Sequence, residues 1–353
     1  MAADDPLRSH YPVPEKAQRF EGQLKPSFQR MLCDLHAEVT AEQCHFYHTL
    51  DLGGGEVVEG GWDLRGYEGA YLGHLSLPGQ RVIEFGPASG YLTFWMEAQG
   101  ATVTAFDLAP GLAPDLVPLP GVDLEAHARS GAETARQVRN SWWYAHARRR
   151  SSARAVYGDI YALPSDIGRY DVSTFGSILL HLERPFAALR EAARITEQAM
   201  VITDLLPDLV FGGEHNSFVE FNPGEEEANL VNWWRISPGA AAKMLRVLGF
   251  PHVEFHYFEG FYRPHHDPGQ PAEKRFMYSA VGRRKAGLPP REPPPAAALE
   301  VDRRVRVEVP VITVENYNDA HGRLNTIHRS LAWKLAKPLR LVFPPRGPGG
   351  TNP

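Results

Sequence analysis

An acid and two glycines separate an apolar run from a helical segment in "VIEFGPASG", residues 82–90. The order Glu84-x-Gly86-x-x-x-Gly90 is typical of a loop whose backbone approaches a ligand, because a Cβ at either glycine would clash with it. The loop lacks the glycine spacing of dinucleotide sites and the Lys-Ser/Thr pair of a phosphate loop. Glu84 favours a cationic, phosphate-free nucleoside, and Pro87 and Ser89 join the same candidate cofactor site. The alternative is a tight strand-to-helix turn without a ligand.

Two further acids follow strand-like segments downstream. Asp107 ends "VTAFDL", where a carboxylate accepts hydrogen bonds from both hydroxyls of a ribose, and Leu108 follows it. Asp159 comes after the next strand, in "VYGDIYALP", placed to meet an adenine edge with Ile160 beside the ring. Gly176, in "YDVSTFGS", begins a loop expected to face the reacting end of the cofactor. The alternatives are a solvated strand end for Asp107 and a turn cap for Asp159.

Three titratable residues are candidate general bases for a substrate hydroxyl, which is a poor nucleophile while protonated. His181 lies just past the fourth strand in "LLHLERP", and Asp204 ends the fifth strand. His215 lies in a long segment that follows, in "GGEHNSF". The alternatives are a packing role for His181 and a solvated loop position for His215.

Tryptophans and one arginine are candidates for covering the ligands. Trp62, in "GGWDLRGY", is positioned to cover the adenosine or the acceptor, and Arg65 to hold a carboxylate. Trp233 and Trp234 are candidate walls of a substrate pocket. For the tryptophans, packing in the core is an equally weighted alternative.

Strand and helix patterns alternate through residues 80–284, which predicts an α/β domain with a doubly wound, largely parallel sheet. A leader of residues 1–79 precedes it, with a helical pattern from Glu15 to His48 and a β-turn-β piece at Gly53–Gly55, and is expected to act as a lid. Ser237 and Pro238 mark a helix start. Residues 285–300 form a Pro-rich linker, and 301–353 a small strand-and-helix tail with a disordered end. The expected strands cover residues 80–86, 101–108, 153–159, 170–177, 198–207, 252–261 and 274–284.

Composition narrows the class of protein. The 353 residues carry a formal net charge of -5, which gives no overall attraction to nucleic acid or an anionic membrane. No basic-then-apolar leader and no apolar run of about 20 residues is present, so a cytoplasmic protein without integral membrane association is expected. His265, His266 and Asp267 stand together, but no second ligand group at suitable spacing accompanies them, and no metal site is predicted.

Residues 80–283 resemble the class I S-adenosylmethionine-dependent methyltransferases, on "EFGPASG", "VTAFDL", "VYGDIYALP" and "YDVSTFGSILLHLERP" in this order. The resemblance implies a Rossmann-like sheet of seven strands whose last strand is antiparallel, with S-adenosylmethionine across the first loop. "FYHTLDLGGGEVVEGGWDLRGYEGAYL" and "FGSILLHLERPFAALREAARIT" are similar to the branch that contains the tRNA wobble-uridine carboxymethyltransferases. That branch uses carboxy-S-adenosylmethionine and a basic tRNA-binding surface.

Methyl transfer to oxygen of a small molecule or glycan is the function that the resemblance and the composition favour. The acidic chain argues against tRNA, and "HRSLAWKLAKPLRLVF" near the end is similar to short tails of bacterial glycan-assembly proteins. Two alternatives stay open: a tRNA carboxymethyltransferase, and a binding module without turnover. The sequence does not indicate an oligomeric state.

Overall fold

The computed structural model describes residues 39–109, 112–163, 167–207, 216–223, 230–263 and 270–284. These residues all belong to one of the two compact units into which the chain divides. The predicted linker and tail, the first 24 residues of the helix expected from Glu15, and His215 lie outside the described residues. So do His265, His266 and Asp267.

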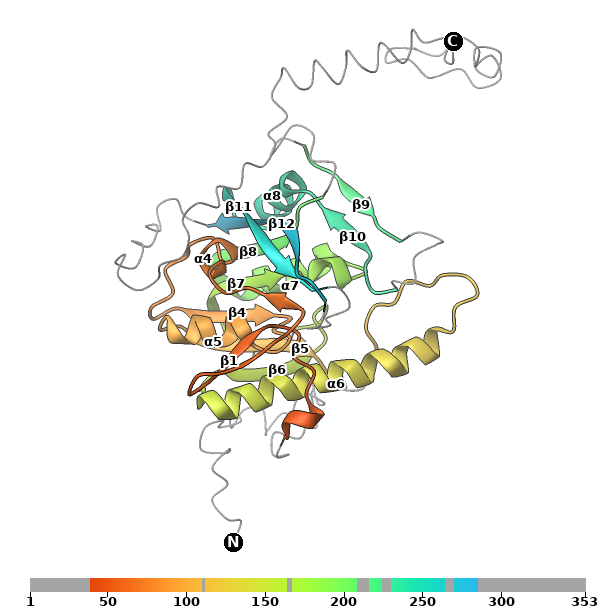
Figure 1. Cartoon of the computed structure of the whole chain (residues 1–353). Coiled ribbons are helices and arrows are strands. Elements are labelled where there is room, and N and C mark those ends of the chain that lie inside the picture. Colours follow the sequence, from red (N-terminus) through yellow and green to blue (C-terminus); the bar gives the residue numbers. More distant parts are fainter. Residues whose placement is uncertain are drawn as a thin grey trace, which may run out of the picture. The chain divides into compact units, whose positions relative to one another are not determined.

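A mixed sheet in the strand order β3-β11-β12-β8-β7-β4-β5-β6 forms the centre of the described part (Figure 1). Its strands are β3 (Trp62–Asp63), β4 (Arg81–Phe85), β5 (Thr102–Leu108), β6 (Arg154–Gly158), β7 (Tyr170–Gly176), β8 (Thr196–Leu205), β11 (His252–Tyr262) and β12 (Glu273–Arg283). Strands β6, β5, β4, β7 and β8 run parallel to one another. The chain order reverses between β4 and β7, and ligands bind at such a switch point in doubly wound sheets.

The predicted fold class is confirmed, including the antiparallel last strand, because β12 pairs antiparallel with both β8 and β11. The predicted count of seven strands is corrected to eight among the described residues. The additional strand is β3 from the leader, which pairs with the edge strand β11 through Trp62–Tyr262 and Asp63–Phe261. Two residues are too few to show the alternation of apolar and polar side chains from which a strand is predicted. The strand β3 forms because the edge of β11 offers it backbone hydrogen-bond partners.

Helices cover both faces of the sheet. They are α4 (Glu68–Tyr71), α5 (Tyr91–Ala98), α6 (Leu124–Arg149), α7 (Pro185–Ile195) and α8 (Pro238–Val247), with 3-10 turns η2 (Ala41–Gln43) and η3 (Leu179–His181). Helices α7 and α8 pack in one apolar cluster with Ile83 and Phe85, whereas α5, part of α6 and the leader pack in another with Val82. Adjacent β4 residues thus face opposite layers, as a strand buried on both sides requires.

Local signals explain several helix ends. The Ser237 hydroxyl accepts a hydrogen bond from the Ala240 amide at 3.2 Å, and Pro238 occupies the first turn of α8, as predicted. The Asp123 carboxylate caps α6 by accepting from the Ala126 amide at 2.9 Å. None of the helices in the described ranges combines the length and apolar character needed to span a membrane.

The leader packs against α6. The predicted β-turn-β piece is present as the antiparallel strands β1 (Leu50–Gly53) and β2 (Glu56–Val58). The predicted helix does not continue through residues 44–48. Beyond η2 this segment is not helical, and its backbone groups form hydrogen bonds with α6 and β3. The His45 amide donates to the Gln137 carbonyl of α6 at 3.1 Å, and the Trp62 amide to the Tyr47 carbonyl at 3.0 Å.

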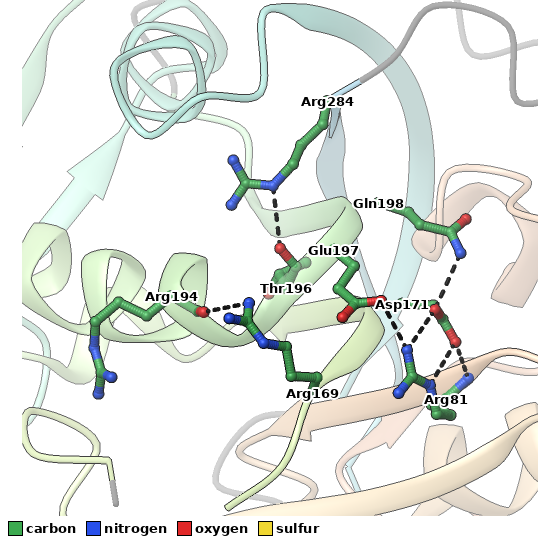
Figure 2. A network of polar contacts seen from close by, with 8 residues as sticks. All are labelled: Arg81, Arg169, Asp171, Arg194, Thr196, Glu197, Gln198 and Arg284. Carbon is green, nitrogen blue, oxygen red and sulfur yellow. Dashed lines mark hydrogen bonds and ion pairs between the residues drawn. The ribbon is translucent and has the colours of Figure 1, made fainter. Parts of the chain in front are cut away.

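A polar network ties the amino ends of β4, β7 and β8 together (Figure 2). Arg81 donates to the Asp171 carboxylate from its amide at 2.9 Å, from Nε at 3.0 Å and from Nη2 at 2.9 Å. The same Nη2 donates to Glu197 at 2.9 Å, and Gln198 donates to Asp171 at 3.1 Å. These bonds lie at the end of the sheet opposite to the carboxyl ends of the strands, so their role is to align the strands.

Replacing Asp171 with Asn is expected to lower the free energy of unfolding at pH 7 by about 1 kcal/mol, because Arg81 is half exposed and solvent weakens the pair. The Arg81 hydrogen bonds hold the pKa of Asp171 at about 2, below its ordinary value of 3.8. The stabilisation is therefore present above pH about 4 and is lost as the pH falls toward about 2.

Urea unfolding of both proteins across this pH range checks the expectation. Glu125→Gln, at an 87% exposed helical pair, serves as the control and should change stability little. A difference between the Asp171 proteins that stays constant down to pH about 2.5 would contradict this account.

Candidate active site

The loop after β4 takes conformations that its glycines permit. Gly86 and Gly90 have φ values of 73° and 89°, in the left-handed region. A Cβ on Gly86 would lie 3.0 Å from the Ile178 side chain, and one on Gly90 would lie 2.6 Å from Phe94 and from Trp142. Both glycines are thus required by close packing as well as by backbone shape, and Gly86 also lines a cavity.

We call this cavity, of about 460 Å³, the first cavity. It lies at the carboxyl ends of β4, β5 and β7, next to the switch point of the sheet. Seven of the residues predicted as site residues line it: Trp62, Glu84, Gly86, Asp107, Leu108, Gly176 and His181. The structure therefore brings together residues that lie more than 100 positions apart in the sequence.

Glu84 is a buried acid in the wall of the first cavity. Only 5% of its surface is exposed, and its Oε2 accepts a hydrogen bond from the Thr93 hydroxyl. Burial raises the pKa of Glu84 to about 7; the Thr93 hydrogen bond opposes the rise, and the charge of Asp107 adds to it. A cationic ligand in the cavity would stabilise the ionised carboxylate.

Asp107 lines the same cavity at the end of β5. Its Oδ1 accepts from the Leu108 amide at 2.8 Å, which fixes the carboxyl group at the strand end. Burial raises the pKa of Asp107, while the Leu108 hydrogen bond and the Arg139 charge lower it. The other carboxylate oxygen has capacity to accept hydrogen bonds from a ligand.

A neighbouring cavity of about 420 Å³, the adjoining cavity, contains the predicted adenine-side residues. Asp159 and Ile160 line it, and it shares Gly86, Asp107 and Leu108 with the first cavity. Asp159 Oδ1 accepts from the Tyr161 amide at 2.9 Å, so the side chain also closes a local turn. The two cavities together form one elongated site along the carboxyl edge of the sheet.

A larger second cavity, of about 1010 Å³, contains Asp204 and Trp234. It shares Pro114, Gly131, Thr134 and Val231 with the first cavity, so the two spaces adjoin. The charge of Asp204 raises the pKa values of Tyr47 and Tyr71, although burial is the larger cause for both. Because both tyrosines line the first cavity, Asp204 lies near the junction of the two cavities.

Asp204 is 4% exposed. The Leu205 amide donates to its Oδ1 at 2.8 Å, and its buried Oδ2 has no hydrogen-bond partner among the described residues. Burial raises the pKa of Asp204 to about 7. A carboxylate with such a pKa is suited to take up and release a proton near neutral pH.

His181 lies in η3 and lines the first and adjoining cavities. Its Nδ1 donates to the Val231 carbonyl at 2.8 Å, which leaves Nε2 as the lone-pair nitrogen of the neutral ring. Burial lowers the pKa of His181, and the Val231 hydrogen bond acts in the opposite direction. The ring is thus kept neutral and fixed in one tautomer.

Other predicted residues lie beside the cavities or away from them. Ser89 is fully buried and accepts from the His48 amide at 2.9 Å, which attaches the leader to the loop. Pro87 and Gly90 are buried in the same loop and line neither the first nor the second cavity. Arg65 is half exposed, outside these linings, and its Nε donates to Asp63 at 2.8 Å.

The three candidate tryptophans differ in their surroundings. Trp62 lines the first cavity, with its ring 4.9 Å from that of Tyr262. Trp233 is buried outside the second cavity's lining and donates to the Asp115 carbonyl at 3.0 Å, so the packing alternative describes it better. Trp234 lines the second cavity and donates to the Leu182 carbonyl at 3.0 Å.

Sequence reasoning missed the wall that α6 and the leader contribute. Gly131, Ala135 and Arg139 follow one face of α6 at four-residue steps and line the first cavity, as do Tyr47 and Tyr71. Small residues at helical spacing in the middle of a long polar helix are the signal that indicates this face. Within the described ranges, no three His, Cys, Asp or Glu residues come together as metal ligands.

No protein-family model matches the chain, and no curated protein matches its sequence. Among solved structures, the N-terminal domain of EvdMO1 with SAH bound is similar at 16% identity over 78% of this chain and 99% of that one, with a TM-score of 0.44. The magnesium protoporphyrin IX methyltransferase ChlM from Synechocystis PCC 6803 with bound SAM is 14% identical over 61% and 76% of the two chains, with a TM-score of 0.37.

A third similar structure is the 1,6-didemethyltoxoflavin-N1-methyltransferase of Burkholderia thailandensis, at 16% identity, covering 62% of this chain and 77% of that one, with a TM-score of 0.36. Identities and scores at this level leave the function to be argued from the residues of this chain.

Replacing Asp204 with Asn is expected to stabilise the protein at pH 8 by about 1–3 kcal/mol, because a pKa of about 7 means that ionisation of the buried group opposes folding. The contribution of the neutral Asp204 carboxyl group to the stability of the parent protein is complete below pH about 4. This contribution is lost as the pH rises through about 7, because the buried group then ionises. The two proteins should therefore unfold alike at low pH and diverge above it.

Urea unfolding between pH 4 and pH 8 measures this difference, with Asp51→Asn in the exposed β1–β2 turn as a matched control. A variant that is less stable than the parent at pH 8 would show that the Asp204 carboxylate is paired with a positive group.

Proposed function

We propose that this chain is an S-adenosylmethionine-dependent methyltransferase that methylates an oxygen atom of a small molecule or glycan. The observation that carries the proposal is the pair of acids, buried Glu84 and partly buried Asp107, at adjacent strand ends beside a glycine loop at the switch point. The elongated site would hold the cofactor, and the second cavity would hold the acceptor.

The residues of the elongated site fit the cofactor. A Cβ on Gly176 would lie 2.8 Å from the Tyr71 hydroxyl, and one on Gly86 would lie 3.0 Å from the Ile178 side chain, so both glycines let these side chains approach the backbone closely in the cavity wall. Asp107 offers an acceptor for ribose hydroxyls, and Asp159 with Ile160 offers a polar edge and an apolar face for adenine. Glu84 supplies negative charge for the sulfonium and amino end.

The chemistry requires little covalent participation by the protein. When bound, S-adenosylmethionine supplies an activated methyl group. Asp204, near the junction of the two cavities, is placed to accept the proton of an acceptor hydroxyl and is therefore the proposed general base. His181 is the second candidate, because its Nε2 lone pair lies on the wall of the elongated site. The leader and α6 exclude water from the site.

A tRNA carboxymethyltransferase is less well supported. The residue predicted to hold an additional carboxylate is Arg65, and its guanidinium is already paired with Asp63. The net charge of -5 also gives no general attraction to tRNA.

Calorimetry with S-adenosylhomocysteine tests the proposal without knowledge of the acceptor. The protein is expected to bind it, and Asp107→Ala is expected to weaken binding by about 1–3 kcal/mol, because ribose hydroxyls lose a carboxylate acceptor. Asp51→Ala, in the exposed hairpin turn, should bind like the parent. Absence of binding by the folded parent protein would overturn the proposal.

A salt-dependent shift of tRNA by the purified protein, together with copurified carboxy-S-adenosylmethionine detected by mass spectrometry, would replace the proposal with the tRNA alternative. Copurified S-adenosylhomocysteine would support ordinary methyl transfer.

A further inference from the structure

The second cavity contains two buried oxygen atoms that have no hydrogen-bond partner in the described part of the chain. They are Oδ2 of Asp204, on a side chain that is 4% exposed, and Oδ1 of Asn232, whose side chain lies close enough to His181 to raise its pKa but makes no hydrogen bond of normal geometry through this oxygen. Both residues line this cavity. Because buried polar atoms are normally paired, two unpaired oxygens in one cavity indicate a ligand that donates at least two hydrogen bonds there.

Aromatic side chains form another part of the cavity. Trp234 and Phe276 line it, and the Phe221 ring packs 5.3 Å from that of Trp234. Phe221 and Phe276 are 56% and 46% exposed, which is unusual for residues of this size. A ligand that combines hydrogen-bond donors with an apolar face would use both features.

Two of the three Lys and Arg residues that line the cavity are paired with acids, and the third, Arg235, is exposed. Lys274 pairs with Glu259 at 2.8 Å, and Arg275 pairs with Glu273 at 2.5 Å. A carboxylate or phosphate placed against the unpaired oxygens of Asp204 and Asn232 would meet two further acceptor atoms, with only the Asn232 Nδ2 group as a donor beside them. A fully apolar ligand would leave both oxygens unpaired, at a cost in free energy.

We infer that the second cavity binds a sugar ring, with two neighbouring hydroxyl groups donating to Asp204 and Asn232 and a C–H face resting on Trp234. The binding of a sugar in this cavity does not depend on the proposed function. The role of that sugar as the methyl acceptor does rest on the proposed function. The cavity volume of about 1010 Å³ is at the upper end of small-molecule sites, which span roughly 300–1,000 Å³, so the ring has room to be one unit of a larger molecule.

The geometry also assigns the reacting group. The hydroxyl that donates to Asp204 is the reacting one because Asp204 is the proposed general base, so its oxygen forms the new bond to the methyl carbon. The bond between that carbon and sulfur breaks, its electron pair stays on sulfur, and the hydroxyl proton passes to the Asp204 carboxylate. The hydroxyl that donates to Asn232 keeps its proton and orients the ring.

Saturation-transfer NMR on the full chain tests this inference with methyl α-glycosides of glucose, galactose and mannose, each at about 10 mM because single sugars bind weakly. The matched controls are the same glycosides with every hydroxyl methylated, which keep the ring but lose all donors. At least one glycoside should give signals, and its methylated counterpart should give at least about fivefold less.

Protein variants locate the binding. Asp204→Ala and Asn232→Ala should each reduce the glycoside signals at least about fivefold, whereas Asp51→Ala should leave them unchanged. Circular dichroism confirms that each variant is folded, and Asn232→Ala, at a partly exposed residue, keeps the test valid if Asp204→Ala does not fold.

Three outcomes would overturn the inference: no glycoside binds, the methylated sugars bind equally well, or both variants bind like the parent. Binding of cyclohexylamine in place of the glycosides would identify an amine site and would also overturn it. S-adenosylhomocysteine binding, measured separately, distinguishes the two proposals, because a protein that binds it but no sugar loses only this inference.

Discussion

A carboxyl group buried away from water raises the free energy of the folded state when it ionises, unless a cation or hydrogen-bond donors compensate. The carboxyl edge of this sheet carries two such groups, Glu84 and Asp204, at the ends of β4 and β8, and the partly buried Asp107 at the end of β5. Burial raises the pKa of each one. The cavities, the glycine loop and the surrounding aromatic residues are arranged around these acids, and ligands that complement them are the simplest physical reason for keeping them there.

The two ends of the sheet have different tasks. At the amino ends of the strands, Arg81, Asp171 and Glu197 satisfy one another and align β4, β7 and β8 (Figure 2). At the carboxyl ends, the Oδ2 atom of Asp204 has no partner among the described residues, and Glu84 has a single hydroxyl donor. The polar groups are thus satisfied by one another at the amino ends, whereas those at the carboxyl ends keep capacity for ligands.

The leader completes the site from outside the sheet. Its Tyr47, Trp62 and Tyr71 line the first cavity, and the His48 amide bonds to Ser89 beneath the glycine loop. Strand β3 attaches this segment to the edge of β11. The second cavity, the proposed acceptor site, combines the end of β8, the start of β12, β10 (Trp234–Ile236) and the first half of α6, so its shape depends on the packing of the sheet against α6.

The sequence by itself determined the doubly wound sheet, because strand and helix periodicities are local, and it placed Glu84, Gly86, Asp107 and His181 at strand ends that must share one edge. Only the tertiary structure decided which side chains face a cavity. Arg65 pairs with its neighbour Asp63, Trp233 is buried, and the α6 face of Gly131 and Ala135 enters the site. It also showed that Asp204 and Asn232 share one cavity. Such contacts join residues distant in sequence, and their burial depends on the whole packed chain rather than on any local pattern.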